Sequence, residues 1–325
     1  MAFLKDKNLA EPILSFSFQV AEEELPVRLD QFLTHKMPWR SRSFFQKMIE
    51  QGEVTVNSKT SRPGRYLLAG ETILVDVSRQ QQEYAPPSVN SLDVIFEDDC
   101  LLVLNKPAGI VVHPTGRHLY DTVMNAVHAR YPGHTYRPRL VHRLDKETSG
   151  VLILAKNEAV RTAMAQQIEN RRVAKTYRAL THGVFSRREG EIVLPLNTSR
   201  YSHIRLKQDV VLQGGLPAHS VYAVEASAPH VSGFIHGLSL VTVNLITGRT
   251  HQIRVHLAAI GHPILADKLY GREKHCRLAE CDISTHLLHA WKFVCRHPGT
   301  GEEIEFKAPL PPVFSGCITH LFGHI

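Results

Sequence analysis

The sequence has no Cys-x-x-Cys pair, no long apolar run and no unbroken apolar leader at its start. Its five cysteines form no even disulfide framework, which is typical of a chain from a reducing compartment. No segment stays apolar and uncharged for the ~18 residues that a membrane-spanning helix needs. Lys5, Asp6, Lys7 and Glu11 interrupt the first residues, so these do not predict a secretory signal. We expect a cytoplasmic protein that contacts no membrane, with a monomer as the default.

The stretch HCRLAECDISTH, residues 275–286, gathers cysteine and histidine but does not have the spacing of a metal site. Cys276 and Cys281 stand farther apart than the usual zinc pair, and no second pair follows them. A zinc hydrolase that draws on the 20 histidines is therefore a remote alternative. We predict no metal site, and the sequence assigns no role to the loop 272–286.

The charge balance points to a polyanionic partner. The formal net charge is +7 with every histidine counted as neutral, which favours nucleic acid. A length of 325 residues predicts two domains. We expect a flexible tail over 1–22, a small RNA-binding module over 23–78, a linker over 79–91 and a larger catalytic domain over 92–325.

The small module predicts two short helices followed by strands. Leu29, Phe32 and Leu33 share one helical face, Ser41 or Ser43 can cap a second helix, and EVTVN and TILVDV alternate as strands. WRSR begins the second helix and SRPGR forms a loop, so positive charge gathers at a helix N-terminus, where phosphates bind well. A solvated basic face is the alternative. The RNA-binding candidates in this module are Arg40, Arg42, Lys47, Arg62 and Arg65.

The sequence of the larger domain predicts more strands than helices, and the strands and helices do not alternate strictly along the chain. VLILA is a buried strand by its apolar run, and EAVRTAMAQQIENRR has the period of an amphipathic helix. We therefore expect an α+β fold with a mixed, largely antiparallel sheet, joined to a small N-terminal α/β module.

Three separated stretches of this domain carry unusual polar residues at a strand end or a helix start: HRLDKETSG, AKTYRAL and TGRTHQIRVH. The first holds one carboxylate, Asp145, among basic residues, and an ordinary turn with a surface ion pair is the simpler interpretation. Glycoside hydrolysis generally uses two carboxylates, and only one is evident. A lone ionised aspartate suits stabilisation of, or attack on, an electron-poor sugar carbon whose leaving group needs no strong acid, such as uracil.

Two residues of the other stretches are candidates to act with Asp145. Arg254 would keep that carboxylate ionised, since a nearby opposite charge favours the charged form; a structural ion pair elsewhere is the alternative. Tyr177 shares a strand face with Lys175 and Ala179, so it is either a packing residue or a ring that stacks on an extruded base.

RLVHRLDKETSGVLILAKN, VAKTYRAL and TGRTHQIRVHLAAIGHPI closely resemble the RluA-type family of pseudouridine synthases. NKPAGIVVHP before them and LLHAWKFVCRHPGTGEEIEFKAPLP after them resemble the flanking segments of the same family, in order over nearly all of residues 92–312. The N-terminal unit is similar to a small RNA-binding module shared with a ribosomal small-subunit protein. The resemblance implies the pseudouridine synthase fold and an RNA-modifying isomerase that needs no cofactor.

The resemblance also implies roles for single positions. Asp145 matches the catalytic aspartate, Arg254 the basic residue that pairs with it, and Tyr177 the tyrosine that stacks on the target base and assists removal of the proton at carbon 5. Arg143 matches the arginine linked to flipping the base, and Arg249 and His251 join it as RNA-binding candidates. Whether Asp145 acts as nucleophile or base stays open.

Large-subunit ribosomal RNA is the substrate that this architecture favours. A transfer-RNA pseudouridine synthase is the alternative, and a non-catalytic RNA-binding or ribosome-assembly factor on the same fold is a rival of another class. The sequence departs from the family pattern at Ala266 and Ser58, where glycine is frequent.

Overall fold

The computed structural model describes residues 15–37, 40–77, 92–115, 118–132, 134, 136–202, 204 and 206–323. They form two compact units, one of residues 15–77 with 111–132 and one of residues 92–110 with 134–323. The predicted linker over 79–91 lies outside the described residues, and the domain boundary at residue 92 stays a prediction. Within the described part of the chain, no helix has the length and apolar character to cross a bilayer.

The described residues of the smaller unit hold a four-stranded antiparallel sheet and three α-helices. The sheet order is β1-β4-β2-β3. As predicted, Ser41 caps the second helix: its hydroxyl accepts a hydrogen bond from the Phe44 amide at 3.2 Å. Phe16, Phe32 and Phe45 are fully buried in its core. The elements are β1 (Ser15–Gln19), a 3-10 turn η2 (Glu22–Glu24), α1 (Leu29–Lys36), α2 (Arg42–Glu50), β2 (Val54–Val56), β3 (Lys59–Thr60), β4 (Thr72–Asp76) and α4 (Val123–Arg130).

The prediction of a flexible tail over 1–22 is wrong for its last part. Residues 15–19 form β1, which pairs along its whole length with β4. Phe16 and Phe18 alternate with polar residues, so one face of this strand enters the core while the other faces solvent. The apolar alternation in SFSFQ was the signal for this strand.

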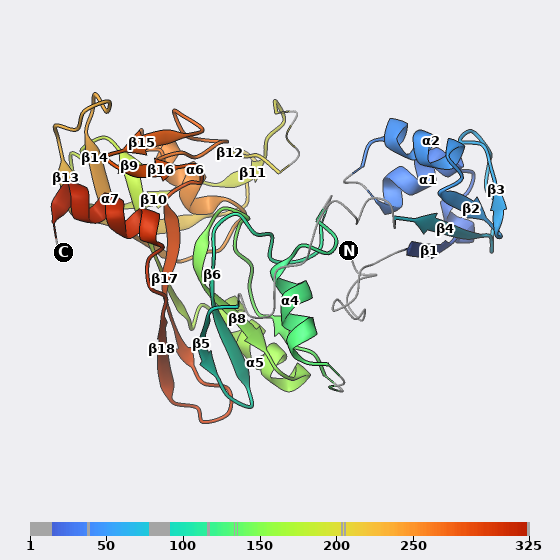
Figure 1. Ribbon diagram of the computed structural model, residues 1–325, viewed down its shortest axis with the longest axis horizontal. Helices are drawn as coiled ribbons and strands as arrows, with labels where there is room; N and C mark the ends of the chain where they lie inside the picture. The colour runs from blue at the N-terminus through green and yellow to red at the C-terminus, as the bar shows by residue number, and fades with distance from the viewer. Residues whose placement is uncertain are drawn as a thin grey trace. The chain divides into compact units, whose positions relative to one another are not determined.

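The larger unit is built on a ten-stranded sheet of order β10-β13-β14-β9-β17-β8-β6-β5, with β18 on β17 and β7 on β8 (Figure 1). Among the strand pairs of the described residues, only β8 with β17 is parallel. The predicted α+β class with a largely antiparallel sheet is thus confirmed. The sheet strands are β5 (Val94–Glu97), β6 (Leu101–Lys106), β7 (Arg139–Leu140), β8 (Ser149–Ala155), β9 (Ala174–His182), β10 (Glu189–Val193), β13 (His219–Ala228), β14 (Leu238–Leu245), β17 (Leu288–Arg296) and β18 (Glu303–Lys307).

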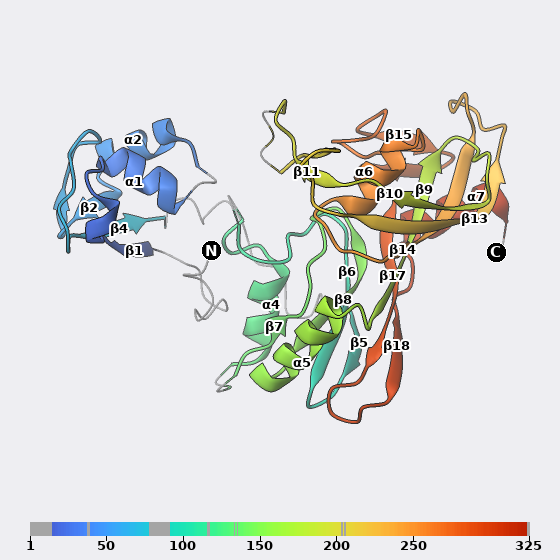
Figure 2. The ribbon, with the colours of Figure 1, turned by 180° about the vertical axis from the view of Figure 1, so that it is seen from behind.

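Three helices cover this sheet. α5 (Glu158–Glu169) buries Val160 and Met164 against β6 and β8, α6 (Gln252–Ala259) packs on β13 and β12, and α7 (Pro312–Phe322) packs beside β16 (Figure 2). Two short antiparallel hairpins complete the unit: β11 (Leu196–Thr198) with β12 (Gln208–Val210), and β15 (Cys276–Leu278) with β16 (Cys281–Ile283). The segment 272–286, to which the sequence gave no role, thus contributes the second hairpin.

Both positions that depart from the family pattern lie in left-handed backbone. Ser58 has a φ of 64° and Ala266 a φ of 57°. Glycine adopts this conformation without the penalty that a Cβ brings. The structure therefore gives a physical reason for the glycine that the family pattern favours at these two positions.

Candidate active site

Asp145 lies in the loop between β7 and β8, at the start of the buried strand. The Thr148 amide donates to the Asp145 carbonyl at 3.2 Å, which closes a turn immediately before β8. Lys106, at the end of β6, is 1% exposed and supports the loop: its Nζ donates to the Lys146 carbonyl at 3.0 Å. Burial lowers the pKa of Lys106 to about 7, and the charge of Asp145 acts against that shift. The sequence reasoning missed Lys106, which meets Lys146 only through the fold.

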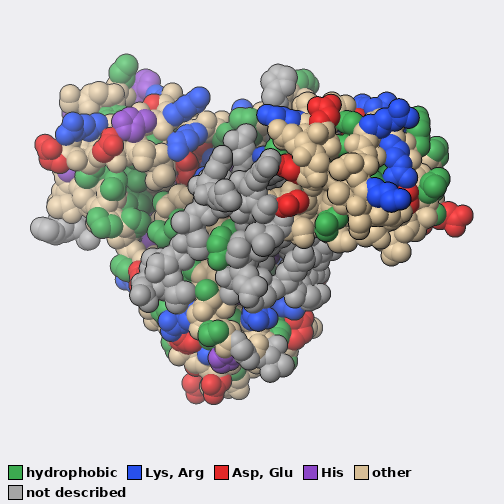
Figure 3. All heavy atoms as spheres, turned by 45° about the vertical axis from the view of Figure 1, so that its right-hand side comes forward, with side chains coloured by type: hydrophobic (Ala, Val, Ile, Leu, Met, Phe, Trp, Pro, Cys, Tyr) green, Lys and Arg blue, Asp and Glu red, His purple; other side chains and the backbone are tan. Residues whose placement is uncertain are grey.

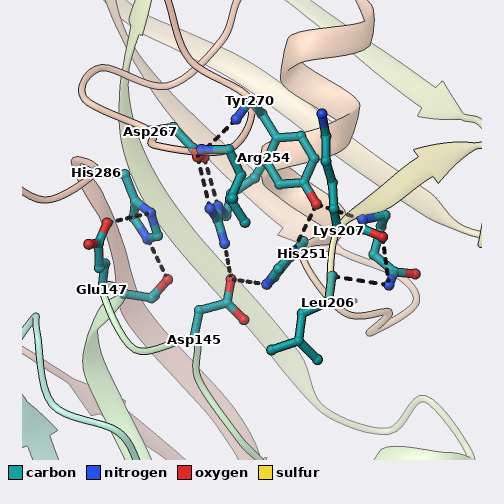
Figure 4. A network of polar contacts seen from close by, with 12 residues as sticks. Asp145, Glu147, Leu206, Lys207, His251, Arg254, Asp267, Tyr270 and His286 are labelled. Atoms are coloured by element: carbon teal, nitrogen blue, oxygen red, sulfur yellow. Dashed lines mark hydrogen bonds and ion pairs between the residues drawn. The ribbon is translucent and has the colours of Figure 1, made fainter. Parts of the chain in front are cut away.

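The fold brings Arg254 to Asp145, as the sequence reasoning expects. Nη1 of Arg254, on α6, donates to Oδ2 of Asp145 at 2.9 Å (Figure 4). The side chain of Arg254 is 6% exposed and that of Asp145 is 26% exposed. The Asp145 carboxylate is thus partly exposed, whereas the Arg254 guanidinium that binds it is buried. The catalytic roles of the two residues stay predictions.

Asp267 occupies the other edge of the same guanidinium. Nε of Arg254 donates to Oδ2 of Asp267 at 2.7 Å and Nη2 donates to Oδ1 at 2.8 Å. Burial acts to raise the pKa of Asp267, and the hydrogen bonds and charge of Arg254 outweigh it, so that pKa lies below its usual value. For Arg254, burial is likewise outweighed by the two carboxylates, which hold its pKa above the usual value. Asp267 lies 13 residues beyond Arg254, and the sequence reasoning did not find it.

His251 and Tyr270 line the adjacent wall. Nε2 of His251 lies 3.8 Å from Oδ2 of Asp145, and Nδ1 lies 2.8 Å from the Tyr270 hydroxyl. That hydroxyl accepts from the Gln208 amide, so its hydrogen is available to Nδ1 and the ring hydrogen belongs on Nε2, toward Asp145. His251 has a φ of 56° just before α6, which turns its ring toward the carboxylate. His251, an RNA-binding candidate by sequence, therefore contacts the candidate carboxylate.

Tyr177 comes to the site through strand pairing. On β17, Ala290 pairs with Gly150 of β8 on one side and with Tyr177 of β9 on the other. This arrangement sets Tyr177 across one strand from the Asp145 loop. The side chain is largely buried, and burial first, then the charge of Asp145, raises its pKa above the usual value. The phenol is thus un-ionised at neutral pH.

His286 supports the loop after Asp145 through contacts with Thr148 and Glu147. Oγ1 of Thr148 lies 2.9 Å from Nε2 of His286, whose Nδ1 lies 3.7 Å from a carboxylate oxygen of Glu147 (Figure 4). Glu147 also forms an ion pair with Lys268. Burial lowers the pKa of His286 to about 3, so the ring is neutral at physiological pH. These contacts tie the Asp145 loop to the chain around residue 267.

The other RNA-binding candidates are divided between the two units. Arg143 is exposed two residues before it, and Arg249 is exposed with Nε donating to the Pro217 carbonyl. The remaining five lie in the smaller unit, where Figure 3 shows Lys and Arg side chains gathered on one part of the surface. Two of these five make internal ion pairs, Arg42 with the buried Asp30 and Arg65 with Glu71. RNA binding by all these residues stays a prediction.

Asp98, Cys100 and His297 form the one group in the described part of the chain with ligand atoms close enough together to hold a metal ion. Nδ1 of His297 accepts hydrogen bonds from the amides of Gly299 and Thr300, so the ring hydrogen of the neutral form belongs on Nε2. Nε2 itself lies 2.8 Å from Oδ2 of Asp98. Nε2 in this tautomer offers no lone pair to a metal. The three side chains are therefore best described as packing contacts between two loops.

Comparison with known proteins agrees with this geometry. Residues 100–259 match the model of the RNA pseudouridylate synthase family, and residues 27–73 match the S4 domain. A Neisseria meningitidis serogroup B protein named ribosomal large subunit pseudouridine synthase D is 38% identical over 87% of this chain and 76% of its own. The uncharacterized RNA pseudouridine synthase YlyB of Bacillus subtilis is 33% identical over 93% of this chain and 96% of its own. The structure named human RNA Pseudouridylate Synthase Domain Containing 1 shares 28% identity, with a TM-score of 0.57 over 72% of this chain and 90% of its own.

Proposed function

This chain belongs to the RNA pseudouridylate synthase family, and we propose that it modifies large-subunit ribosomal RNA with Asp145 as the catalytic carboxylate. An RNA pseudouridine synthase is an isomerase, which detaches the uracil of a uridine from its ribose and reattaches it through carbon 5. The proposal therefore concerns which residue performs the exchange and which RNA carries the uridine.

The observation that carries the assignment is the unequal use of the two Asp145 oxygens. Oδ2 is held by Arg254 at 2.9 Å, whereas no hydrogen bond from the described residues reaches Oδ1. The side chain is 26% exposed, so Oδ1 is accessible to a substrate. A carboxylate with one anchored oxygen and one open oxygen suits a reaction at a sugar carbon.

The reaction proceeds with conserved atoms and electrons. As nucleophile, Asp145 bonds to carbon 1′ of the ribose while the bond to uracil N1 breaks, and uracil leaves with the electron pair. As base, Asp145 takes a proton from the ribose instead, and the same bond breaks. On the nucleophile route the uracil turns and carbon 5 bonds to carbon 1′ while the bond from Asp145 to carbon 1′ breaks, which frees the carboxylate. On the base route carbon 5 bonds to carbon 1′ while Asp145 returns its proton to the ribose. In both cases the proton on carbon 5 is then lost to water, which restores the aromatic base. The un-ionised phenol of Tyr177 supports stacking on that base.

Two observations support ribosomal RNA as the substrate. Relatives from Neisseria meningitidis and Haemophilus influenzae carry the name ribosomal large subunit pseudouridine synthase D. In the S4-like unit, Arg40 and Arg42 lie at the start of α2, where phosphate contacts are favourable, and Lys47 adds a positive charge in the last turn of the same helix. Transfer RNA is the alternative that the experiment must separate.

The test is release of tritium from RNA labelled at carbon 5 of uridine. Ribosomal and transfer RNA transcripts are incubated with wild type, Asp145→Asn and a matched control, Glu225→Gln. Glu225 is also a carboxylate paired with an arginine, Arg178 at 2.8 Å, but it has no contact with Asp145. We expect release from ribosomal RNA by wild type and Glu225→Gln alone. Release from transfer RNA alone would refute the proposal that ribosomal RNA is the substrate. Release by Asp145→Asn would refute the proposal that Asp145 is the catalytic carboxylate. No release by any of the three proteins would favour a non-catalytic RNA-binding factor.

A further inference from the structure

Asp267 and Asp145 lie on opposite sides of one guanidinium (Figure 4). Asp267 engages Nε and Nη2 of Arg254, at 2.7 and 2.8 Å, which leaves Nη1 as the donor that faces Asp145. Two parallel hydrogen bonds fix the plane of a guanidinium, whereas a single one lets it rotate. The two hydrogen bonds to Asp267 thus fix the direction in which Arg254 donates to Asp145.

Asp267 is itself fixed by the turn that contains it. Its Oδ1 also accepts from the amides of Leu269 at 2.9 Å and Tyr270 at 3.2 Å, and its side chain is 0% exposed. The Gly271 amide donates to the Asp267 carbonyl at 2.8 Å, and a Cβ on Gly271 would lie 2.5 Å from that oxygen. The backbone of the turn therefore leaves the carboxylate little freedom.

The neighbours of Asp267 in the same turn contact the same site. Lys268 pairs with Glu147, two residues after Asp145, and the Tyr270 hydroxyl meets His251 at 2.8 Å. The Tyr270 ring also lies 5.1 Å from the guanidinium carbon of Arg254. Asp267, Lys268 and Tyr270, from one short turn, thus contact residues that lie around the Asp145 carboxylate.

The shared guanidinium also has an electrostatic consequence. With Asp267 in place, one positive charge serves two carboxylates, so Asp145 faces a cation that is already partly compensated. Without Asp267, the whole charge of Arg254 would bear on Asp145, and Nε and Nη2 would be buried without their acceptor. Both changes oppose attack by an oriented, electron-rich carboxylate.

We propose that Asp267 is a positioning residue, which acts through Arg254 to hold the Asp145 carboxylate in its reactive orientation. This inference rests on the proposed function of Asp145. A buried ion pair that only stabilises the fold is the alternative, and the two differ in what they do to the chemical step.

The experiment compares Asp267→Asn with Glu225→Gln, which breaks a second bidentate arginine pair of the same unit, Arg178 with Glu225. Single-turnover tritium release at saturating enzyme gives the rate of chemistry, and RNA affinity and the melting temperature are measured on the same preparations. We expect the Asp267→Asn rate to fall roughly 10²-fold, as for a misplaced catalytic group, with RNA affinity unchanged and the variant folded at the assay temperature. The Glu225→Gln rate should equal that of wild type.

An Asp267→Asn rate within about threefold of wild type would overturn the inference, as would an equal rate loss in Glu225→Gln. If Asp267→Asn does not fold, Asp267→Glu keeps the charge and moves the carboxylate by one methylene. A slower chemical step with unchanged RNA affinity then supports positioning, and a wild-type rate overturns it. No release by wild type on any RNA would refute the proposed function together with this inference, whereas release with an undiminished variant rate refutes the inference alone.

Discussion

Gly150 lies so close to Ala290 that a Cβ on it would stand 2.2 Å from the Ala290 carbonyl oxygen. This approach joins β8 to β17 in the one parallel pair of the described strands, directly after the Asp145 loop. Gly150 also has a φ of 109°, which a residue with a side chain rarely adopts. Both features require glycine at this position.

Gly150→Ala should therefore damage the site and the sheet together. We expect a loss of about 2 kcal/mol or more in the free energy of unfolding, from overpacking and backbone strain combined. Gly109→Ala is the matched control, because Gly109 also has a positive φ, 88°, but has no atom within 4 Å of a Cβ. Urea unfolding of both variants checks the expectation, and an equal effect in the two would show that the contact with Ala290 is unimportant.

Arg254→Lys should keep the charge but lose the fork that serves two carboxylates. A lysine cannot replace the three hydrogen bonds to Asp145 and Asp267, so buried acceptors lose their donors at a cost of about 1–3 kcal/mol. Isomerisation should fall roughly 10²-fold, and RNA affinity should not change. Arg178→Lys, in a more exposed pair, should retain full activity. Single-turnover rates decide between these outcomes, and full activity of Arg254→Lys would rule out a geometric role for the fork.

Lys106 should make stability depend on pH in the alkaline range. Its pKa is about 7 in the folded protein and about 10.4 when unfolded, so between these values the unfolded state binds more protons. Stability relative to Lys106→Met therefore rises with pH from about 7 to about 10.4 and is lowest below pH 7. Thermal unfolding of both proteins at several pH values measures the difference. For Lys175, whose pKa burial lowers less, to about 8, a methionine variant should show a smaller rise.

Tyr177→Phe and Tyr177→Ala should differ in how they hold the target base. Phenylalanine keeps the stacking ring, whereas alanine removes an interaction of about 1–3 kcal/mol per base. We expect Tyr177→Ala alone to weaken the affinity for RNA by that amount, measured with a transcript that contains the target uridine. Equal affinities for the two variants would argue against stacking.

Ser58→Gly should stabilise the smaller unit. Asn57 and Ser58, with φ values of 49° and 64°, form the two-residue connection between β2 and β3, a geometry that favours Asn followed by Gly. We expect a gain of about 0.5–1 kcal/mol, seen as a higher melting temperature. Asn57→Gly should give no such gain, because Oδ1 of Asn57 accepts from the Thr72 amide at 2.9 Å. A lower melting temperature for Ser58→Gly would show that left-handed strain is not limiting there.

The sequence predicted those features that depend on neighbours in the chain. The Ser41 cap, the buried strand β8 and the amphipathic helix α5 follow from local chemistry and from the spacing of apolar residues. Asp267 and Lys106 could not be found in this way, because their roles arise from contacts with Arg254 and with the Lys146 carbonyl across the fold. β1 was missed for another reason: its alternation is only five residues long and adjoins polar sequence.

The place of β17 in the sheet has a consequence for synthesis of the chain. Asp145, Tyr177 and Arg254 all precede β17, yet this strand lies between β8 and β9 and joins the loop of Asp145 to the strand of Tyr177. A nascent chain that ends before Leu288 carries every sequence motif of the site without the strand that assembles it. Assembly of the site therefore requires that β17 has left the ribosome and has paired with β8 and β9.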